Sequence, residues 1–239
     1  MKTKKDVIVL TGAGQLGMAI ARRMGQGKKI FVADWKLENA QAIAKTMAEA
    51  GFDVVPFKVD ISSRQSVVQL IEAAQKEGEI TIFINAAGVS PSHAPIEQIL
   101  KVDLYGTALL LEEFGKVIKR GGTGVTISSQ SGHRMPALAP EEDRLLATTP
   151  TEELLKLEML KSENIKDTLH AYQMAKRCNG KRVMAEAVKW GERGARINSI
   201  SPGIIITPLA LDEINGPAET FIKKCLPKVL PVVPELQMK

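Results

Sequence analysis

The sequence predicts one α/β domain, in which a parallel sheet is covered by helices on both faces. Short apolar runs of four to six residues alternate with longer stretches of helical period, and the alternation continues to about residue 200 with one break. Neighbouring parallel strands need such helical crossovers, and right-handed crossovers give a doubly wound sheet. We therefore expect residues 1–239 to form a single doubly wound domain.

Local sequence features support several of the expected helices and strands. The alanine-rich stretch at 37–50 favours helix, Ser62 or Ser63 can cap the helix that follows, and Pro95 precedes a long helical pattern. The expected strands are 7–10, 29–33, 54–59, 80–84, 124–128 and 196–200. The expected helices are 16–24, 37–50, 63–76, 96–118 and 169–191.

The break lies at 133–168, which is rich in proline and charge. It contains two short helical candidates, at 141–147 and 151–160. We interpret this segment as an insertion.

Composition excludes several classes of protein. The net charge of +5 is concentrated at residues 1–5 and 221–239, and the chain has only ten aromatic residues, so no nucleic-acid surface is predicted. No apolar stretch approaches the roughly 20 residues of a membrane span, and the basic start lacks a signal core. A cytoplasmic protein without a membrane partner is expected. Cys178 and Cys225 stand apart from each other and from any Cys/His cluster, so neither a disulfide framework nor a metal site is predicted.

A glycine motif of the form GxGxxG follows the first strand. It consists of Gly12, Gly14 and Gly17, with Gln15 and Leu16 opening the next helix. Free backbone N–H groups and a helix dipole at such a turn can hold a dinucleotide pyrophosphate. The alternative is a tight turn without a ligand.

Asp34 ends the second strand, seventeen residues beyond Gly17, and Trp35 follows it. A carboxylate at this place can accept both ribose hydroxyls and repels a 2′-phosphate, so NAD is expected in preference to NADP. The alternative role for Asp34 is that of a turn residue.

Tyr172 and Lys176 lie four residues apart within a predicted helix and therefore share one face. A phenol is a poor base at neutral pH, and an adjacent ammonium favours the phenolate. The alternative is an exposed helical pair without a catalytic role.

Six motifs in order resemble the short-chain dehydrogenase/reductases, a family with a Rossmann fold. They are TGAGQLG, Asp60 after the third strand, NAAG at 85–88, ISSQSG with Ser129, YQMAK, and SPGIIITP after the sixth strand. The resemblance covers residues 6 to about 210.

The resemblance implies a role for each matching position. Tyr172 is the expected acid/base, Lys176 holds the ribose and favours the phenolate, and Ser129 binds the substrate oxygen. Asp60 and Ile61 are expected at the adenine. The other expected cofactor contacts are Asn85, Ala86, Ala87, Pro202, Gly203, Ile205 and Thr207.

The activity implied is hydride transfer between NAD and a small secondary alcohol or ketone, with Tyr172 moving the proton. The alternative is a nucleotide-binding sensor, or an inactive truncated member of the family, without turnover. A methyltransferase would not account for YxxxK and PGIIIT.

Three positions depart from the family pattern. The glycine loop is one residue shorter than usual, and Asp103 stands where the family has an asparagine that helps hold a water near the lysine. Asp103 is expected to offset the charge of Lys176, or else only to bond backbone. The insertion at 133–168 separates Ser129 from Tyr172 and is a lid candidate, whose apolar residues weakly favour an apolar substrate.

The segment 221–239 carries Pro227, Pro231 and Pro234 among apolar residues, which disfavours both helix and central strand. We therefore expect the last strand of the family to be missing, and our hypothesis is that the tail is a frameshift product. The expected assembly is a homodimer through the helices at 96–118 and 169–191 rather than a tetramer.

Overall fold

A computed structural model describes residues 5–205 and 207. The chain divides into two compact units, residues 1–202 and 203–239, each considered by itself. The expectations for 221–239, which concern the frameshift and the missing last strand, lie outside the described residues.

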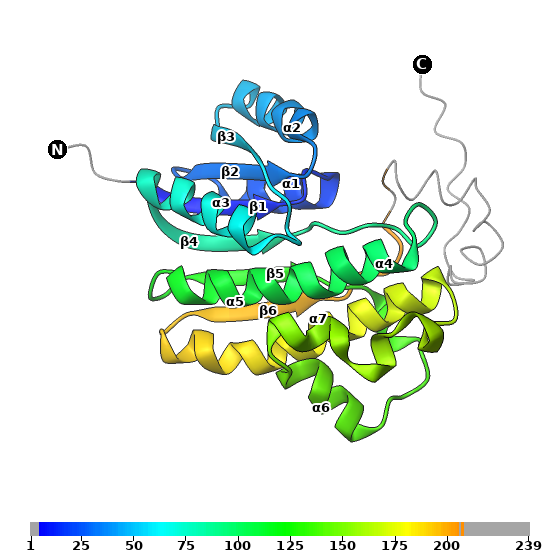
Figure 1. The fold of residues 1–239 in the computed structure, drawn as a ribbon. Coiled ribbons are helices and arrows are strands. Elements are labelled where there is room, and N and C mark those ends of the chain that lie inside the picture. Colours follow the sequence, from blue (N-terminus) through cyan, green and yellow to red (C-terminus); the bar gives the residue numbers. More distant parts are fainter. Residues whose placement is uncertain (1–4, 206, 208–239) are drawn as a thin grey trace, which may run out of the picture. The chain divides into compact units, whose positions relative to one another are not determined.

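The first unit is built on a six-stranded parallel sheet with the strand order β3-β2-β1-β4-β5-β6 (Figure 1). This order reverses direction between β1 and β4, which confirms the predicted doubly wound sheet. Each strand lies within two residues of its expected position. The strands are β1 (Lys5–Thr11), β2 (Lys29–Asp34), β3 (Asp53–Lys58), β4 (Gly78–Asn85), β5 (Thr123–Ile127) and β6 (Arg196–Ile200).

Helices cover both faces of the sheet. On one face, α1 (Gln15–Met24) and α2 (Leu37–Glu49) pack on alternate residues of β1, Ile8 and Leu10. On the other face, α3 (Arg64–Glu77), α5 (Thr107–Val117) and α7 (Thr168–Glu192) enclose Val7 and Val9. Burial on both faces is the reason that the strands are almost continuously apolar. Within the described part of the chain, no helix combines the length and apolarity needed to cross a membrane.

The long helix predicted at 96–118 forms in three parts. It starts as α4 (Ile96–Ile99), widens into a π-helical segment η1 (Leu100–Gly106) and continues as α5. Asp103 lies at the centre of the π-helical segment and is fully buried. Such wide turns are rare and often occur at functional sites.

The 3₁₀ turn η2 (Gln130–His133) leads into the insertion, whose first helix is α6 (Pro140–Thr148), which confirms the first helical candidate. The prediction of a helix at 151–160 was wrong. This stretch forms the 3₁₀ turns η3 (Thr151–Lys156) and η4 (Glu158–Leu160), followed by η5 (Ser162–Asn164). The buried Leu154 and Leu160, with the partly buried Leu157 between them, recur every third residue, and this spacing matches the three residues per turn of a 3₁₀ helix.

The insertion is packed firmly against the rest of the first unit. Four of its apolar side chains, Met135, Leu146, Leu154 and Leu160, are buried in a core cluster that includes residues of η1 and α7. These four side chains face the core, so they give no support for an apolar substrate.

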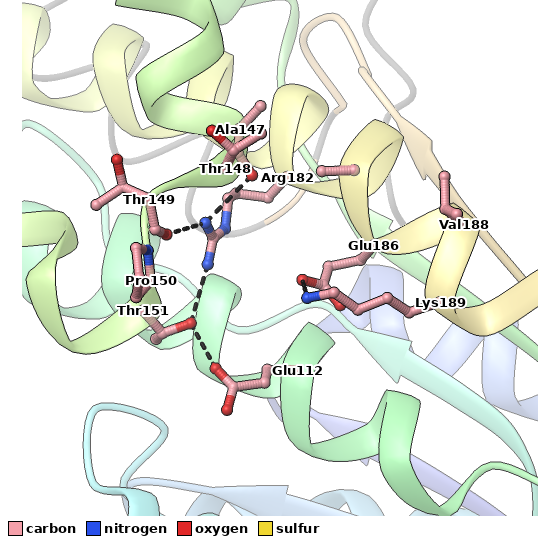
Figure 2. Close-up of a pocket in the computed structure, with 11 residues that line it drawn as sticks. Glu112, Ala147, Thr148, Thr149, Pro150, Thr151, Arg182, Glu186, Val188 and Lys189 are labelled. Atoms are coloured by element: carbon pink, nitrogen blue, oxygen red, sulfur yellow. Dashed lines mark hydrogen bonds and ion pairs between the residues drawn. The ribbon is translucent and has the colours of Figure 1, made fainter.

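Polar contacts around a cavity of about 300 Å³ add to this packing (Figure 2). The guanidinium of Arg182 on α7 donates to the carbonyl oxygens of Ala147 and Thr149 and to the hydroxyl of Thr151. Thr151 in turn donates to Glu112 of α5 at 2.6 Å. The insertion is thereby joined to two helices of the main body.

Candidate active site

The predicted site residues gather where the strands end. Thr11 pairs in register with Ala33 of β2 and with Asn85 of β4, so the glycine loop, the end of β2 and the end of β4 meet at one edge of the sheet. Asp60 and Ser129 follow β3 and β5 at the same edge. In doubly wound sheets, ligands bind at this edge, beside the point where the strand order reverses.

The glycine loop fits a pyrophosphate. Gly12 has a φ of +89°, and a Cβ at this position would lie 2.4 Å from the backbone nitrogen of Ala87, so only glycine is tolerated. Gly14 is the N-cap of α1, has no side-chain cap, and has no atom of the described residues within 4 Å of where its Cβ would lie. Gln15 and Leu16 are the first helical residues. The loop therefore offers open space at a helix N-terminus.

Asp34 lies beside this loop. One carboxylate oxygen accepts a hydrogen bond of 2.8 Å from the backbone N–H of Ala13, and the other accepts one of 2.9 Å from Lys36. Asp34 thus also fills the alternative role of a turn residue. The adjacent Trp35 is 62% exposed. The predicted ribose contact of Asp34 stays a prediction.

Asp60 and Ile61 have different surroundings. One carboxylate oxygen of Asp60 accepts from both the N–H and the hydroxyl of Ser62, while its backbone N–H donates to Ser66. The side chain of Ile61 is buried in the core, where it lies against Gly106. The expected adenine contacts of both residues stay predictions.

The buried side chain of Asn85 forms hydrogen bonds that join the ends of several strands and the start of α5. Its carbonyl oxygen accepts from the Thr11 hydroxyl at 3.0 Å and from the Ala87 N–H at 3.2 Å. Its amide nitrogen donates to Thr126 at 2.9 Å and to Thr107 at 3.2 Å. We did not predict the three threonines, and only their positions at or near element ends could have signalled them. The Asn85 side chain is thus fully engaged within the protein, and the cofactor contacts expected at 85–87 stay predictions.

Lys176 and Tyr172 lie together on α7. The Lys176 Nζ is 5.2 Å from the centroid of the Tyr172 ring, and Lys176 is only 6% exposed. This burial argues against the alternative of an exposed helical pair. The Asp167 side chain caps the start of α7 by accepting from the His170 N–H.

Asp103 contacts Lys176 directly. Its Oδ2 lies 3.1 Å from the Lys176 Nζ, and its Oδ1 accepts a hydrogen bond of 2.8 Å from the Val89 N–H. Asp103 therefore bonds backbone and also contacts the Lys176 ammonium, which argues against the alternative that it only bonds backbone. Burial raises the pKa of Asp103, against the opposing effect of Lys176. Burial acts to lower the pKa of Lys176, but Asp103 and Tyr172 outweigh it and the net shift is upward.

Two neighbouring serines follow β5. The buried Ser128 donates its hydroxyl to the carbonyl oxygen of Lys176 at 2.7 Å, a contact that we did not predict. Ser129 is half-buried and caps η2 by accepting from the Ser131 N–H at 3.1 Å. The predicted substrate residue thus lies beside the segment that carries Lys176.

The segment after β6 is fixed at its start, because the Pro202 carbonyl accepts from the Gln130 N–H at 2.9 Å. Gly203, Ile205 and Thr207 belong to the second unit, and their expected role at the nicotinamide stays a prediction.

Metal binding and thiol chemistry find little support among the residues that the structure describes. No group of three His, Cys, Asp or Glu side chains there could hold a metal ion. Burial raises the pKa of the Cys178 thiol to about 12, so this thiol is unreactive at neutral pH. Cys225 lies outside the described residues.

Comparison with known proteins decides the family. The family described as short chain dehydrogenase matches residues 6–140. A short-chain dehydrogenase/reductase of Alternaria brassicicola, bsc3, is 41% identical over 91% of this chain and 80% of its own length. The chain belongs to the short-chain dehydrogenase/reductase family. A D-threitol dehydrogenase of Mycolicibacterium smegmatis is 28% identical over 92% of this chain and 78% of its own length.

Solved structures of the family share the fold. A xylitol dehydrogenase bound to NAD+ covers 89% of this chain and 75% of its own, with a TM-score of 0.67 and 18% identity. A mutant actinorhodin polyketide ketoreductase with NADPH covers 90% and 77%, with a TM-score of 0.64 and 20% identity. The family binds NAD(P)(H), and its members act on small molecules as dehydrogenases and reductases. This short-chain dehydrogenase/reductase is thus an oxidoreductase with a nucleotide-binding Rossmann fold.

Proposed function

We propose that the protein transfers a hydride between NAD and a secondary alcohol or ketone, with Tyr172 as the acid/base. The observation that carries the proposal is the buried Lys176 ammonium, 5.2 Å from the Tyr172 ring, on a helix held against the end of β5. A cation at this distance favours the phenolate, which is the form that accepts a proton.

When bound, the nicotinamide would accept or supply the hydride. The side chains of the site have the remaining tasks. Tyr172 takes the proton from the alcohol during oxidation and returns it during reduction. The Ser129 hydroxyl donates to the substrate oxygen and stabilises the charge that develops on it. Lys176 would hold the cofactor ribose, and its ammonium lies beside the Tyr172 ring.

The preference for NAD rests on Asp34. The carboxylate is fixed beside the glycine loop by the N–H groups of Ala13 and Lys36. The Asn39 side chain also donates to Asp34, at 3.4 Å. A carboxylate has about four acceptor positions, so Asp34 can still accept from a ribose hydroxyl. A 2′-phosphate at the same place would be repelled.

The first experiment is a titration of the purified protein with NADH and with NADPH, followed by tryptophan fluorescence. Trp35 is exposed beside Asp34, whereas Trp190 is fully buried and bonded to the Leu111 carbonyl. We expect NADH to bind about tenfold or more tightly than NADPH, equivalent to about 1.4 kcal/mol. The Trp35→Phe variant, which keeps Trp190, is the control for the origin of the signal.

Turnover is then measured with NAD+ and a panel of secondary alcohols. Oxidation of at least one alcohol supports the proposal. NADH binding without turnover on any alcohol or ketone would favour the alternative of a nucleotide sensor or inactive member. Binding of neither cofactor would contradict both the proposed activity and the sensor alternative.

The cytoplasmic location stays a prediction.

A further inference from the structure

Asp103 and Lys176 form a buried pair of opposite charges next to Tyr172. Asp103 is 0% exposed and Lys176 6% exposed, and their charged atoms are 3.1 Å apart. No other described residue donates a hydrogen bond to the Asp103 Oδ2. In such surroundings the two charges act strongly on each other and on any third group nearby.

Three backbone features and one side chain hold the pair in place. The π-helical segment η1 carries Asp103 toward α7, and the Val89 N–H fixes its second oxygen at 2.8 Å. Gly88 leaves room for both groups, because a Cβ there would lie 3.2 Å from Asp103 and 3.4 Å from Lys176. The Asn179 amide, with its nitrogen toward η1, donates to the Asp103 carbonyl at 2.9 Å.

Among the residues that the structure describes, the charged and titratable groups that face Lys176 come from two elements. Asp103 belongs to η1, and Tyr172 belongs to the same helix as Lys176. The loop after β4 contributes the uncharged Gly88, and the end of β5 contributes the uncharged Ser128, which bonds the Lys176 carbonyl. Asp103 is thus the carboxylate that sets the net charge beside the phenol among the described residues.

We propose that Asp103 is a positioning residue that acts through Lys176, holding the ammonium by direct contact and offsetting its charge, so that Tyr172 ionises at a higher pH than it would beside an unpaired lysine. This inference concerns regulation of the site described above and rests on the proposed function for its kinetic consequence. Its physical part, the ionisation of Tyr172, is independent of turnover.

The sequence allows a direct measurement. The chain has two tyrosines, Tyr105 and Tyr172. In a Tyr105→Phe background the near-ultraviolet absorbance of phenolate therefore reports on Tyr172 alone. The pH at which half of this phenol is ionised is measured without cofactor or substrate, with Asp103 present and with Asp103→Asn. We expect Asp103→Asn to lower it by about one pH unit, the smaller end of the effect that an unpaired neighbouring cation has on an acid.

Asp143→Asn in the same background is the matched control. It removes another carboxylate that is paired with cations of α7, Arg177 and Lys181, and leaves Lys176 untouched. We expect no shift in this control. An equal shift in both variants, or an unchanged midpoint in Asp103→Asn, would overturn the proposal. A higher midpoint would overturn it as well, because Lys176 would then have lost its proton with its partner.

Folding is checked by circular dichroism, and Asp103→Ser serves as a second neutral variant with the same expected shift. Where alcohol oxidation is detected, kcat/KM is measured against pH. The acid limb of this profile should shift to lower pH by the same number of pH units. If no alcohol is oxidised, the proposed function fails, yet the absorbance titration still decides the role of Asp103.

Discussion

The Ser128 hydroxyl donates a hydrogen bond of 2.7 Å to the Lys176 carbonyl, which joins the end of β5 to the middle of α7. Two elements that are distant in sequence are thereby fixed at the residue that carries the ammonium. The next residue, Ser129, caps η2, and among the described residues its side chain makes no hydrogen bond to α7. Neighbouring serines therefore have separable roles.

Replacing Ser128 by alanine should lower the free energy of unfolding by about 1 kcal/mol, the usual net contribution of one hydrogen bond. Replacing Ser129 should instead reduce kcat/KM by about 10²-fold with little change in stability, because a donor to the substrate oxygen is lost. Urea unfolding and steady-state kinetics of both variants measure these effects. Equal losses of stability in the two variants would argue against separate roles.

Tyr172→Phe should reduce turnover by about 10²–10⁴-fold and leave the dissociation constant of NADH nearly unchanged, because only the proton carrier is removed. Kinetics with the best alcohol and the fluorescence titration described above are compared on one preparation. Retained turnover would exclude Tyr172 as the acid/base.

Two glycines of the cofactor loop should respond differently to alanine. Gly12 has a φ of +89°, and the alanine Cβ would lie 2.4 Å from the Ala87 backbone nitrogen, so we expect a loss of at least about 1–3 kcal/mol in stability. At Gly14, where the space is open, the fold should be unaffected, while a methyl group weakens NADH binding by about tenfold. Thermal unfolding and NADH titration distinguish the two. Unchanged NADH affinity in Gly14→Ala would contradict the prediction that the pyrophosphate binds at Gly14.

Attachment of the insertion should depend on pH through Glu112. Although burial acts to raise the pKa of Glu112, hydrogen bonds from Arg64, Thr151 and Lys116 lower it to about 2. Because the folded value lies below the ordinary 4.5, the stabilisation is fully present above pH 4.5 and is lost as the pH falls toward 2. Glu112→Gln should therefore lower the denaturation midpoint at pH 7, and the difference from the parent should shrink steadily below pH 4.5. A difference that is constant with pH would contradict this linkage.

The expected homodimer should use α7 more than α5. Most of α5 is buried by its own chain, whereas Met184 and Val188, one turn apart on α7, are 69% and 65% exposed. Sedimentation should show a dimer that dissociates in Val188→Glu. Met24→Glu, on α1 and 45% exposed, is the control that should remain dimeric. A compact tetramer, or a dimer unaffected by Val188→Glu, would contradict this interface.

Local patterns were sufficient to predict most of the fold. The apolar runs predicted all six described strands, and the glycine motif predicted the turn after β1, because strands buried on both faces and turns with positive φ leave signals within a few residues. The helix at 151–160 was wrong because the packing of Leu154 and Leu160 against the core, which selects the 3₁₀ turns, involves distant residues.

The sequence by itself determined the parallel sheet, the order of the motifs and the spacing of Tyr172 and Lys176 on one helix. Only the tertiary structure decided that Asp103 contacts Lys176, that the Asn85 side chain is occupied by three threonines, and that apolar residues of the insertion face the core. The physical reason is the separation along the chain over which each interaction acts. Periodicity and turn chemistry act between near neighbours, whereas ion pairs, buried hydrogen bonds and core contacts join residues that the chain brings together only on folding.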